Sequence, residues 1–512
     1  MRSKIASFVE KISYKSICIL SFIVVLYLFV QDLFMRVRIN SAETVLFARQ
    51  NWWGYLIGLI GIIALFMAKK YFKVLFTHRK MVGFTIVYVI LMTLFVVTVQ
   101  MEPRADQQIV LQIADQVSKG DFSAWQKGAY CDMYPNQYGL ITVLAVFSKV
   151  LGNYNWLAYQ CLNILFIVLA AWGMKKSLYL IFKNEKFAVL SYVVLLCYLP
   201  LGAYVTFVYG TLPGLVCVTT GSYFLILGWQ ENKPVNCAVG AVLLTMAALL
   251  KNNYLIALIT MAIAGGLVWL KQRGKTIIIS LVMIVFMYIL ANAGVNLYIS
   301  GKTEIRQQGG IPAVAWVAMG LQNEGTKGPG WYTSYAKDVY WNHNSNNELA
   351  GKAAKQAIKE SFSKMKSDPA YCFSFFNRKT ASQWNEATFE SVWINQFRAD
   401  SEHIPSWLAK LYVDNSFLNC LYAYACDVFL FLIWTGLLMF LVKMWKEQDI
   451  RKIIWLLMFF GGFLFHLFWE AKGQYTLIYV WFCIPYALWG YLHVSGSIHK
   501  YIKRRFQNGE RE

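Results

Sequence analysis

The sequence predicts an all-α integral membrane protein with about 12–13 transmembrane helices, outer juxtamembrane helices and a small helical extracytoplasmic cap. Of its 512 residues, 58% are hydrophobic and 15% are charged, whereas a soluble domain has about 45–50% and about 25%. The hydrophobic residues gather in long runs, and basic residues gather in short segments between them. This composition excludes an ordinary cytosolic enzyme, a disordered chain and a disulfide scaffold.

A membrane-spanning helix needs about 20 predominantly apolar residues. The first apolar run is not followed by a small-residue cleavage site, so we expect a retained anchor and not a removed signal peptide. The expected spans are residues 16–30, 51–68, 82–100, 156–174, 187–207, 210–228, 235–250, 254–270, 276–299, 421–442, 453–469 and 475–495.

Basic residues indicate how these spans are oriented. The chain has 48 Lys and Arg against 27 Asp and Glu, a net charge of +21. The positive-inside rule places short basic segments in the cytoplasm, so we expect a multi-pass plasma-membrane protein with both termini cytoplasmic. The charge is thus an orientation signal, not a nucleic-acid-binding surface. More than half of the basic residues lie in the segments 2–15, 69–80, 175–186, 233, 271–275, 443–452 and 500–511.

This orientation leaves the apolar stretch 136–151 without a crossing. Span 82–100 leads outward and span 156–174 leads back, so residues 136–151 should lie at the outer face or re-enter. If the stretch crosses instead, every later loop changes side; we favour the first arrangement. The outer segment 300–420 is too long for a plain loop. Within it, Ala and Ile recur at helical spacing between lysines over 346–369, which predicts a surface helix.

The expected organisation follows from these spans. A set of N-terminal helices precedes a first large outer loop, a transmembrane core, an extracytoplasmic segment, C-terminal transmembrane helices and a basic cytoplasmic tail. The corresponding residues are 1–100, 101–155, 156–299, 300–420, 421–499 and 500–512.

Carboxylates concentrate in the first outer loop. Asp106 lies six residues beyond the predicted span end and precedes an amphipathic pattern. A carboxylate beside the membrane can act as a general base or bind a metal, so Asp106 is our candidate catalytic residue. The alternative is a solvated loop residue, which is the interpretation we favour for the other acids, Glu102, Asp115, Asp121 and Asp132.

Two more outer turns carry candidate residues. Lys251 lies between two predicted spans, where it could hold a phosphate as a point charge or mark the interface by snorkelling. Glu470, Lys472 and Tyr475 combine an acid, a base and an aromatic ring, which suits a site for sugar and phosphate; the alternative is an aromatic-belt turn. His466 is more typical of a packed core residue.

The remaining patterns narrow the chemistry. Trp, Tyr, Asn, Gln and Glu in GPGWY and KTASQWNEATFESVW suit either a sugar-facing surface or interfacial anchors. Both GKT sequences lack the first glycine of a P-loop, and HExxH and CxxC are absent. We also expect no cytosolic loop large enough to bind a nucleotide sugar. A sugar donor would therefore have to come from the bilayer on a lipid carrier.

Four stretches then suggest a family: EPRADQ with Asp106, the run YPNQYGLITVLAVFSKVLG at 134–152, LKNNYLI with Lys251, and Glu470 before Tyr475. Their order resembles the polytopic, lipid-carrier-dependent glycosyltransferases of the C-type superfamily, in the bacterial branch related to protein O-mannosyltransferases and aminoarabinose transferases. The resemblance implies two added N-terminal helices before a shared core.

The resemblance also implies residue roles. Asp106 would activate the acceptor and Lys251 would meet the carrier phosphate. The cavity floor would be shaped by Tyr134, Asn136 and Gln137. Relatives often have a second acid after the aspartate and an Arg before the last-span Tyr, whereas this chain has Gln107 and Gln474. The first difference weakens a paired-carboxylate or metal scheme, and the second leaves the phosphate to Lys251 or Lys472.

We therefore expect a glycosyltransferase that moves a sugar from a polyprenyl-phosphate carrier to an envelope glycan, lipid or protein at the outer face. Its expected partners are the donor, membrane lipids and the acceptor, with no nucleic acid. We assign no cofactor and no metal ligand, and leave a divalent metal open. The alternatives are a transporter or lipid flippase, a polysaccharide polymerase or ligase, and a regulatory membrane protein. Acids at one outer edge, with few charges inside the spans, favour surface chemistry.

Overall fold

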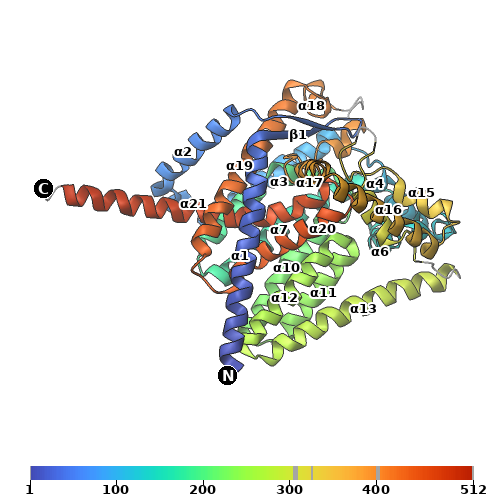
Figure 1. Cartoon of the computed structure of the whole chain (residues 1–512), viewed down its shortest axis with the longest axis horizontal. Helices are drawn as coiled ribbons and strands as arrows, with labels where there is room; N and C mark the ends of the chain where they lie inside the picture. Colours follow the sequence, from blue (N-terminus) through green and yellow to red (C-terminus); the bar gives the residue numbers. More distant parts are fainter. Residues whose placement is uncertain (1, 76, 304–308, 325–326, 399–403, 510–512) are drawn as a thin grey trace.

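The computed structural model describes residues 2–75, 77–303, 309–324, 327–398 and 404–509. Long helices form the body of the molecule, with α1 crossing the front from the N-terminus to β1 and α13 running along the lower right side (Figure 1). The long helices are α1 (Arg2–Phe34), α2 (Trp53–Leu75), α3 (His78–Val99), α7 (Trp156–Phe182), α8 (Glu185–Leu196), α10 (Thr211–Glu231), α11 (Pro234–Leu250), α12 (Leu255–Gln272), α13 (Lys275–Thr303), α19 (Phe417–Met444), α20 (Ile454–Phe468) and α21 (Gly473–Gly509).

Each predicted span overlaps one of these helices. Within the described ranges, nine helices are long and apolar enough to cross a membrane, or up to ten if the bent pair Glu185–Leu196 and Leu199–Thr206 is one span. Two shorter apolar helices, Trp53–Ala64 and Pro234–Leu250, lie where the sequence predicts two further spans. The all-α integral membrane fold is therefore confirmed.

The expected span 187–207 is not one straight helix but a bent pair of helices. The chain bends by 54° between Leu196 and Leu199, and the short helix α9 (Leu199–Ala203) begins there. Pro200 lies in the first turn of α9. Proline has no N–H to donate to the preceding turn, and it disfavours a helical residue before it, so one helix ends and another starts.

The non-crossing stretch forms α6 (Tyr138–Leu151), a helix of 14 residues. At 1.5 Å per residue it is about 21 Å long, short of the roughly 30 Å hydrocarbon core. It packs against α4 (Asp106–Ser118) and α11. Its length agrees with a helix that lies beside the bundle without spanning it.

Residues 31–50, which we expect to be an outer loop, contain an antiparallel hairpin. Strand β1 (Met35–Ile39) pairs with β2 (Val45–Arg49). Val37 is fully buried, and together with Val45 it packs against Trp331. The alternation of side chains in MRVRI favours a strand, and burying one face supplies the stability that a two-stranded hairpin lacks alone.

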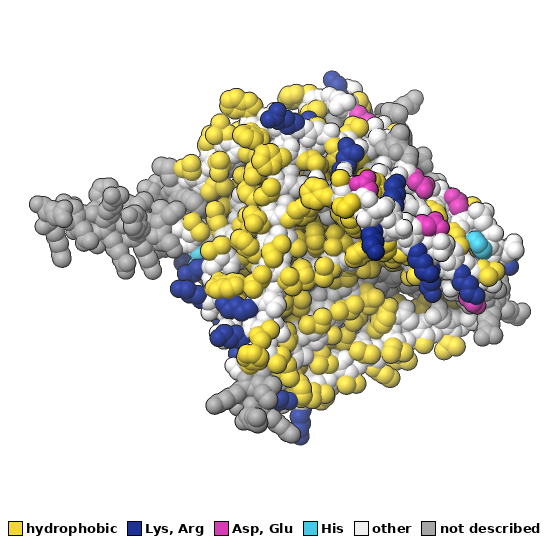
Figure 2. All heavy atoms as spheres, viewed as in Figure 1, with side chains coloured by type: hydrophobic (Ala, Val, Ile, Leu, Met, Phe, Trp, Pro, Cys, Tyr) yellow, Lys and Arg dark blue, Asp and Glu magenta, His cyan; other side chains and the backbone are white. Residues whose placement is uncertain are grey.

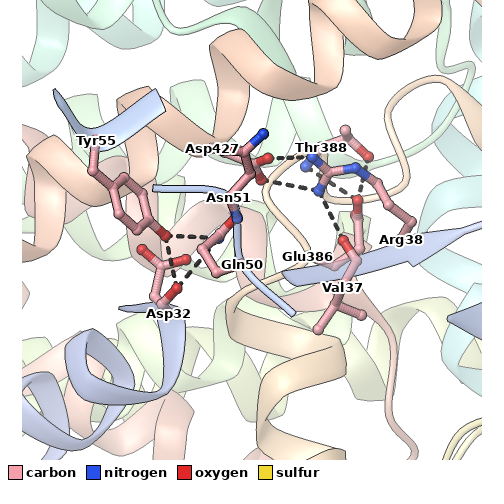
Figure 3. Close-up of polar contacts among 9 residues, drawn as sticks. All are labelled: Asp32, Val37, Arg38, Gln50, Asn51, Tyr55, Glu386, Thr388 and Asp427. Carbon is pink, nitrogen blue, oxygen red and sulfur yellow. Dashed lines mark hydrogen bonds and ion pairs between the residues drawn. The ribbon is translucent and has the colours of Figure 1, made fainter. Parts of the chain in front are cut away.

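The base of this hairpin is attached to the bundle by a buried polar network (Figure 3). The Arg38 guanidinium donates to both oxygens of Asp427 on α19, at 2.9 Å to Oδ1. Beside it, Tyr55 and Gln50 donate to the carbonyl of Asp32 at 2.7 and 3.2 Å. The hairpin is thus joined to α1, α2 and α19.

Helices between α13 and α19 form the expected helical segment, which lies mostly at the right in Figure 1. The predicted surface helix is confirmed as α16, and acidic and basic side chains alternate on this part of the surface, whereas hydrophobic side chains cover the middle of the molecule (Figure 2). The predicted tail 500–512 continues α21 to Gly509, and 510–512 lie outside the described residues. The helices are α14 (Ala313–Gly320), α15 (Tyr335–Asn342), α16 (Asn347–Ser367), α17 (Pro369–Trp384) and α18 (Ser406–Ala409).

Candidate functional site

Most of the predicted site residues meet in one group of side chains, which we call the outer polar cluster. Its members come from loops that are far apart in the sequence but lie at the same end of the bundle. They are Asp106, Tyr130, Tyr134, Tyr209, Lys251, Glu390, Glu470, Lys472 and Tyr475.

Asp106 is the exposed carboxylate of this cluster. It begins α4, directly after Ala105, whose φ of 49° lies in the left-handed region. An acid in the first turn of a helix is favoured by the helix dipole. Although the side chain contacts solvent, surrounding protein raises its pKa by desolvation, opposed by the charge of Lys472 and a hydrogen bond with the Tyr130 hydroxyl. A ligand-accessible carboxylate with raised proton affinity suits a general base.

Lys251 has an extended backbone and connects α11 to the 3-10 turn Asn252–Tyr254, which leads into α12. Its side chain is buried, and Nζ donates to the Thr211 hydroxyl at 2.8 Å. The rings of Tyr209 and Tyr475 have their centroids 5.7 and 5.8 Å from Nζ. Burial lowers the pKa of Lys251 to about 7, opposed by the charge of Glu390. A lysine in this position can gain or lose its charge near neutral pH.

The turn between α20 and α21 supplies an acid and a second base. Glu470 is buried, and the Tyr475 hydroxyl donates to its Oε2 at 3.3 Å. Burial raises the pKa of Glu470 to about 7, opposed by Lys472. For Lys472, burial lowers the pKa, but the charges of nearby carboxylates, foremost Glu390, outweigh it and leave the pKa raised. Lys472 is therefore the permanent cation of the cluster.

Lys379 fixes the position of the turn between α20 and α21. Its Nζ donates to the carbonyl of Trp469 at 2.8 Å and to the carbonyl of Gly320 at 2.5 Å. It is completely buried. Burial lowers its pKa to about 7, opposed by Glu470. Because α17 carries Lys379 and α14 ends at Gly320, the helical segment between α13 and α19 is attached directly to the residues beside Glu470.

In the segment after Met133, Tyr134 and Gln137 contact members of the outer polar cluster, whereas Asn136 lines a crevice. Tyr134 packs against Tyr130, with ring centroids 4.8 Å apart, and the Gln137 amide donates to the Tyr209 hydroxyl. Asn136 lies in the 3-10 turn Pro135–Gln137 and lines a crevice with Asn252, Asn292 and Asn296. Its expected place in the cavity floor stays a prediction.

Glu390 is a carboxylate that sequence reasoning did not select. It is fully buried, its Oε1 accepts the Gln474 N–H at 3.3 Å, and its Oε2 has no hydrogen-bond partner among the described residues. Burial raises its pKa to about 7, opposed by Lys472. Phe389 and Glu390 have φ values of 50° and 60°, and such strained backbone is often found at functional sites. The only sequence signal was its place in the aromatic and polar stretch KTASQWNEATFESVW.

Two amides of α7 hold the loops that carry Asp106 and Tyr209. Gln160 donates to the carbonyls of Met101 and Thr206 at 2.6 and 3.0 Å. Asn163 donates to the carbonyls of Val205 and Phe207 at 2.9 and 3.0 Å. Both amides are fully buried, so they satisfy carbonyls that irregular backbone inside a membrane protein leaves without partners.

His466 is buried beneath Tyr475, with ring centroids 6.0 Å apart. Packing of this kind is what the sequence predicts for it. Throughout the described part of the chain, no group of three or more His, Cys, Asp or Glu side chains could hold a metal ion.

A bundle of long apolar helices with charged groups buried at one end defines a polytopic integral membrane protein. The chain belongs to a family described as conserved hypothetical integral membrane protein, whose model matches residues 7–487. The comparison with curated proteins gives no match, and neither does the comparison with solved structures. Multi-pass insertion in a membrane follows from the fold and the family, while the plasma membrane and the side of the termini stay predictions.

Proposed function

We propose that the protein is a membrane glycosyltransferase that moves a sugar from a polyprenyl-phosphate carrier to an acceptor at the outer face. The observation that supports this most is the outer polar cluster. It combines the solvent-accessible carboxylate of Asp106 with two buried lysines, Lys251 and Lys472. A general base beside cations is what displacement of a phosphate from a sugar requires.

In the proposed reaction, Asp106 accepts the proton of an acceptor hydroxyl while that oxygen bonds to the anomeric carbon. The bond between this carbon and the carrier phosphate oxygen breaks, and the electron pair leaves with the phosphate. Lys472 stays charged and stabilises the phosphate, and Lys251 adds a second positive charge when it is protonated. A fixed charge or dipole that faces the charge developing in the transition state typically stabilises that state by about 3–4 kcal/mol when water is largely excluded.

Aromatic rings surround these charges and suit the binding of a sugar. Trp393 lies with its ring centroid 4.9 Å from the Lys472 ammonium and 4.1 Å from the Arg104 guanidinium. Trp316 lies between Tyr134 and Trp469, with ring centroids 6.1 and 6.4 Å away. Such rings offer flat apolar faces to a sugar ring and leave hydroxyls for the polar groups beside them.

The test is transfer by the purified protein from a radiolabelled panel of polyprenyl-phosphate sugars to envelope extract, with products identified by mass. Asp106→Asn should reduce transfer at least 100-fold, since general-base catalysis contributes about 10²–10⁴. Asp121→Asn is the matched control: Asp121 lies in the same outer loop, is exposed, and accepts the Ser123 N–H through an oxygen that Asn retains. Full transfer by Asp106→Asn, or no transfer from any donor by the wild type, would refute the proposal.

A further inference from the structure

Glu43, in the turn of the hairpin, bridges two lysines from distant parts of the chain. Its Oε2 pairs with Lys327 at 2.5 Å, and its Oε1 pairs with Lys472 of the outer polar cluster. Only 13% of the Glu43 side chain is exposed. The residue has a φ of 60°, a conformation that costs energy for a non-glycine residue. The turn thus holds a carboxylate between two cations at the edge of the proposed active site.

The electrostatics keep this carboxylate charged. Burial acts to raise the pKa of Glu43, but Lys472 and Lys327 outweigh it and leave the pKa below its usual range. Lys327 lies 5.6 Å from the ring centroid of Tyr332, and Lys472 lies 5.8 Å from that of Trp331. Two lysines set among aromatic rings and bridged by one anion have the composition of a phosphate-binding site.

The hairpin does not depend on Glu43 for its position. Arg38 is bonded to Asp427, the Ser41 N–H donates to Asp414 at 2.9 Å, and Val37 is fully buried. The Glu43 side chain can therefore rotate away from the lysines while the strands stay in place.

We propose that Glu43 is an internal counter-ion that occupies a phosphate site formed by Lys327 and Lys472, and that the carrier phosphate displaces it on binding. The identity of this anion rests on the proposed function. In the empty protein the carboxylate neutralises two cations that would otherwise be costly to bury. A ligand phosphate must compete with it, so the hairpin tip sets the affinity for the lipid carrier.

The test compares the binding of a fluorescently labelled polyprenyl phosphate to the wild type, Glu43→Gln and Glu348→Gln in detergent micelles. Glu348 pairs with Lys352 on exposed α16, so its variant removes an ion-paired carboxylate elsewhere. Glu43→Gln should bind roughly tenfold more tightly, because the ligand no longer displaces a charged competitor, and Glu348→Gln should bind as the wild type does. Glu43→Asp keeps the charge on a shorter side chain, so its affinity should fall between those of the wild type and Glu43→Gln. It provides a second variant if Glu43→Gln folds poorly.

A second measurement separates this inference from the proposed function. Inorganic phosphate should protect Lys327, whose side chain is 30% exposed, from acylation, read by mass spectrometry, at lower concentration in Glu43→Gln than in the wild type. Protection by phosphate without binding of polyprenyl phosphate would support the anion site and refute the lipid carrier as its ligand. Unchanged or weaker binding in Glu43→Gln, or no protection by either ligand, would overturn the inference.

Discussion

Breaking the Arg38–Asp427 pair should destabilise the protein strongly. The pair is bidentate, and 23% of the Arg38 side chain and 6% of the Asp427 side chain are exposed. Arg38→Met leaves Asp427 buried without its partner, a change that costs about 3–5 kcal/mol when both charges are buried. Because Arg38 keeps some contact with solvent, we expect the lower end, about 3 kcal/mol.

The assay is unfolding by SDS titration in detergent micelles, followed by tryptophan fluorescence. Arg49→Met is the matched control, since Arg49 lies in the same hairpin and its side chain is exposed; surface changes usually stay within about 0.5 kcal/mol. The double variant Arg38→Met/Asp427→Leu should recover most of the loss, because an apolar pair removes the stranded charge. A loss below about 1 kcal/mol in Arg38→Met, or no recovery in the double variant, would contradict the reasoning.

Three further outcomes are expected. Polyprenyl phosphate should bind less well as pH rises through about 7, where Lys251 loses its proton. Lys251→Arg should show a smaller decline, because guanidinium stays charged while Glu390 and Glu470 still ionise near this pH; equal pH profiles would argue against the phosphate role. Gly210→Ala places Cβ 1.9 Å from the Leu250 carbonyl oxygen and should cost about 1–3 kcal/mol of stability, whereas Gly83→Ala, which meets nothing within 4 Å, should not destabilise. Gln160→Leu removes both hydrogen bonds that its amide donates and should cost about 2 kcal/mol, measured in the same titration.

Hydropathy and charge are local properties, so they predict the spans well. Every predicted span falls on a helix, and the surface helix at Asn347–Ser367 is where the Ala and Lys pattern indicates. Interruptions inside apolar runs carry weaker signals. Pro200 marks the break after Leu196, yet the run LLCYLPLGAYV reads as uniformly apolar.

For the site as well, the sequence predicts some residues and misses others. Asp106, Lys251 and Glu470 flank predicted spans, so the alternation of crossings is enough to predict that they share one face, and the structure brings them together. Glu43 and Glu390 reach the same place through strand pairing and a strained turn. These depend on contacts between segments hundreds of residues apart, which a single sequence does not record. The roles of all these residues stay predictions until transfer and binding are measured.

The buried amide of Gln160 has a consequence for how a large lipid could reach the site. One side chain on α7 is bonded both to Met101, at the start of the Asp106 loop, and to Thr206, at the start of the Tyr209 loop. Separating these two loops would break a hydrogen bond of a fully buried amide and leave a carbonyl without its partner, at a cost of about 1–3 kcal/mol. Under the proposed function, entry from another side avoids this cost, and a crevice that Asn136 and Asn292 line lies beside α13. α13 contributes a largely uncovered apolar surface there, so a polyprenyl chain could lie along it while its phosphate turns inward.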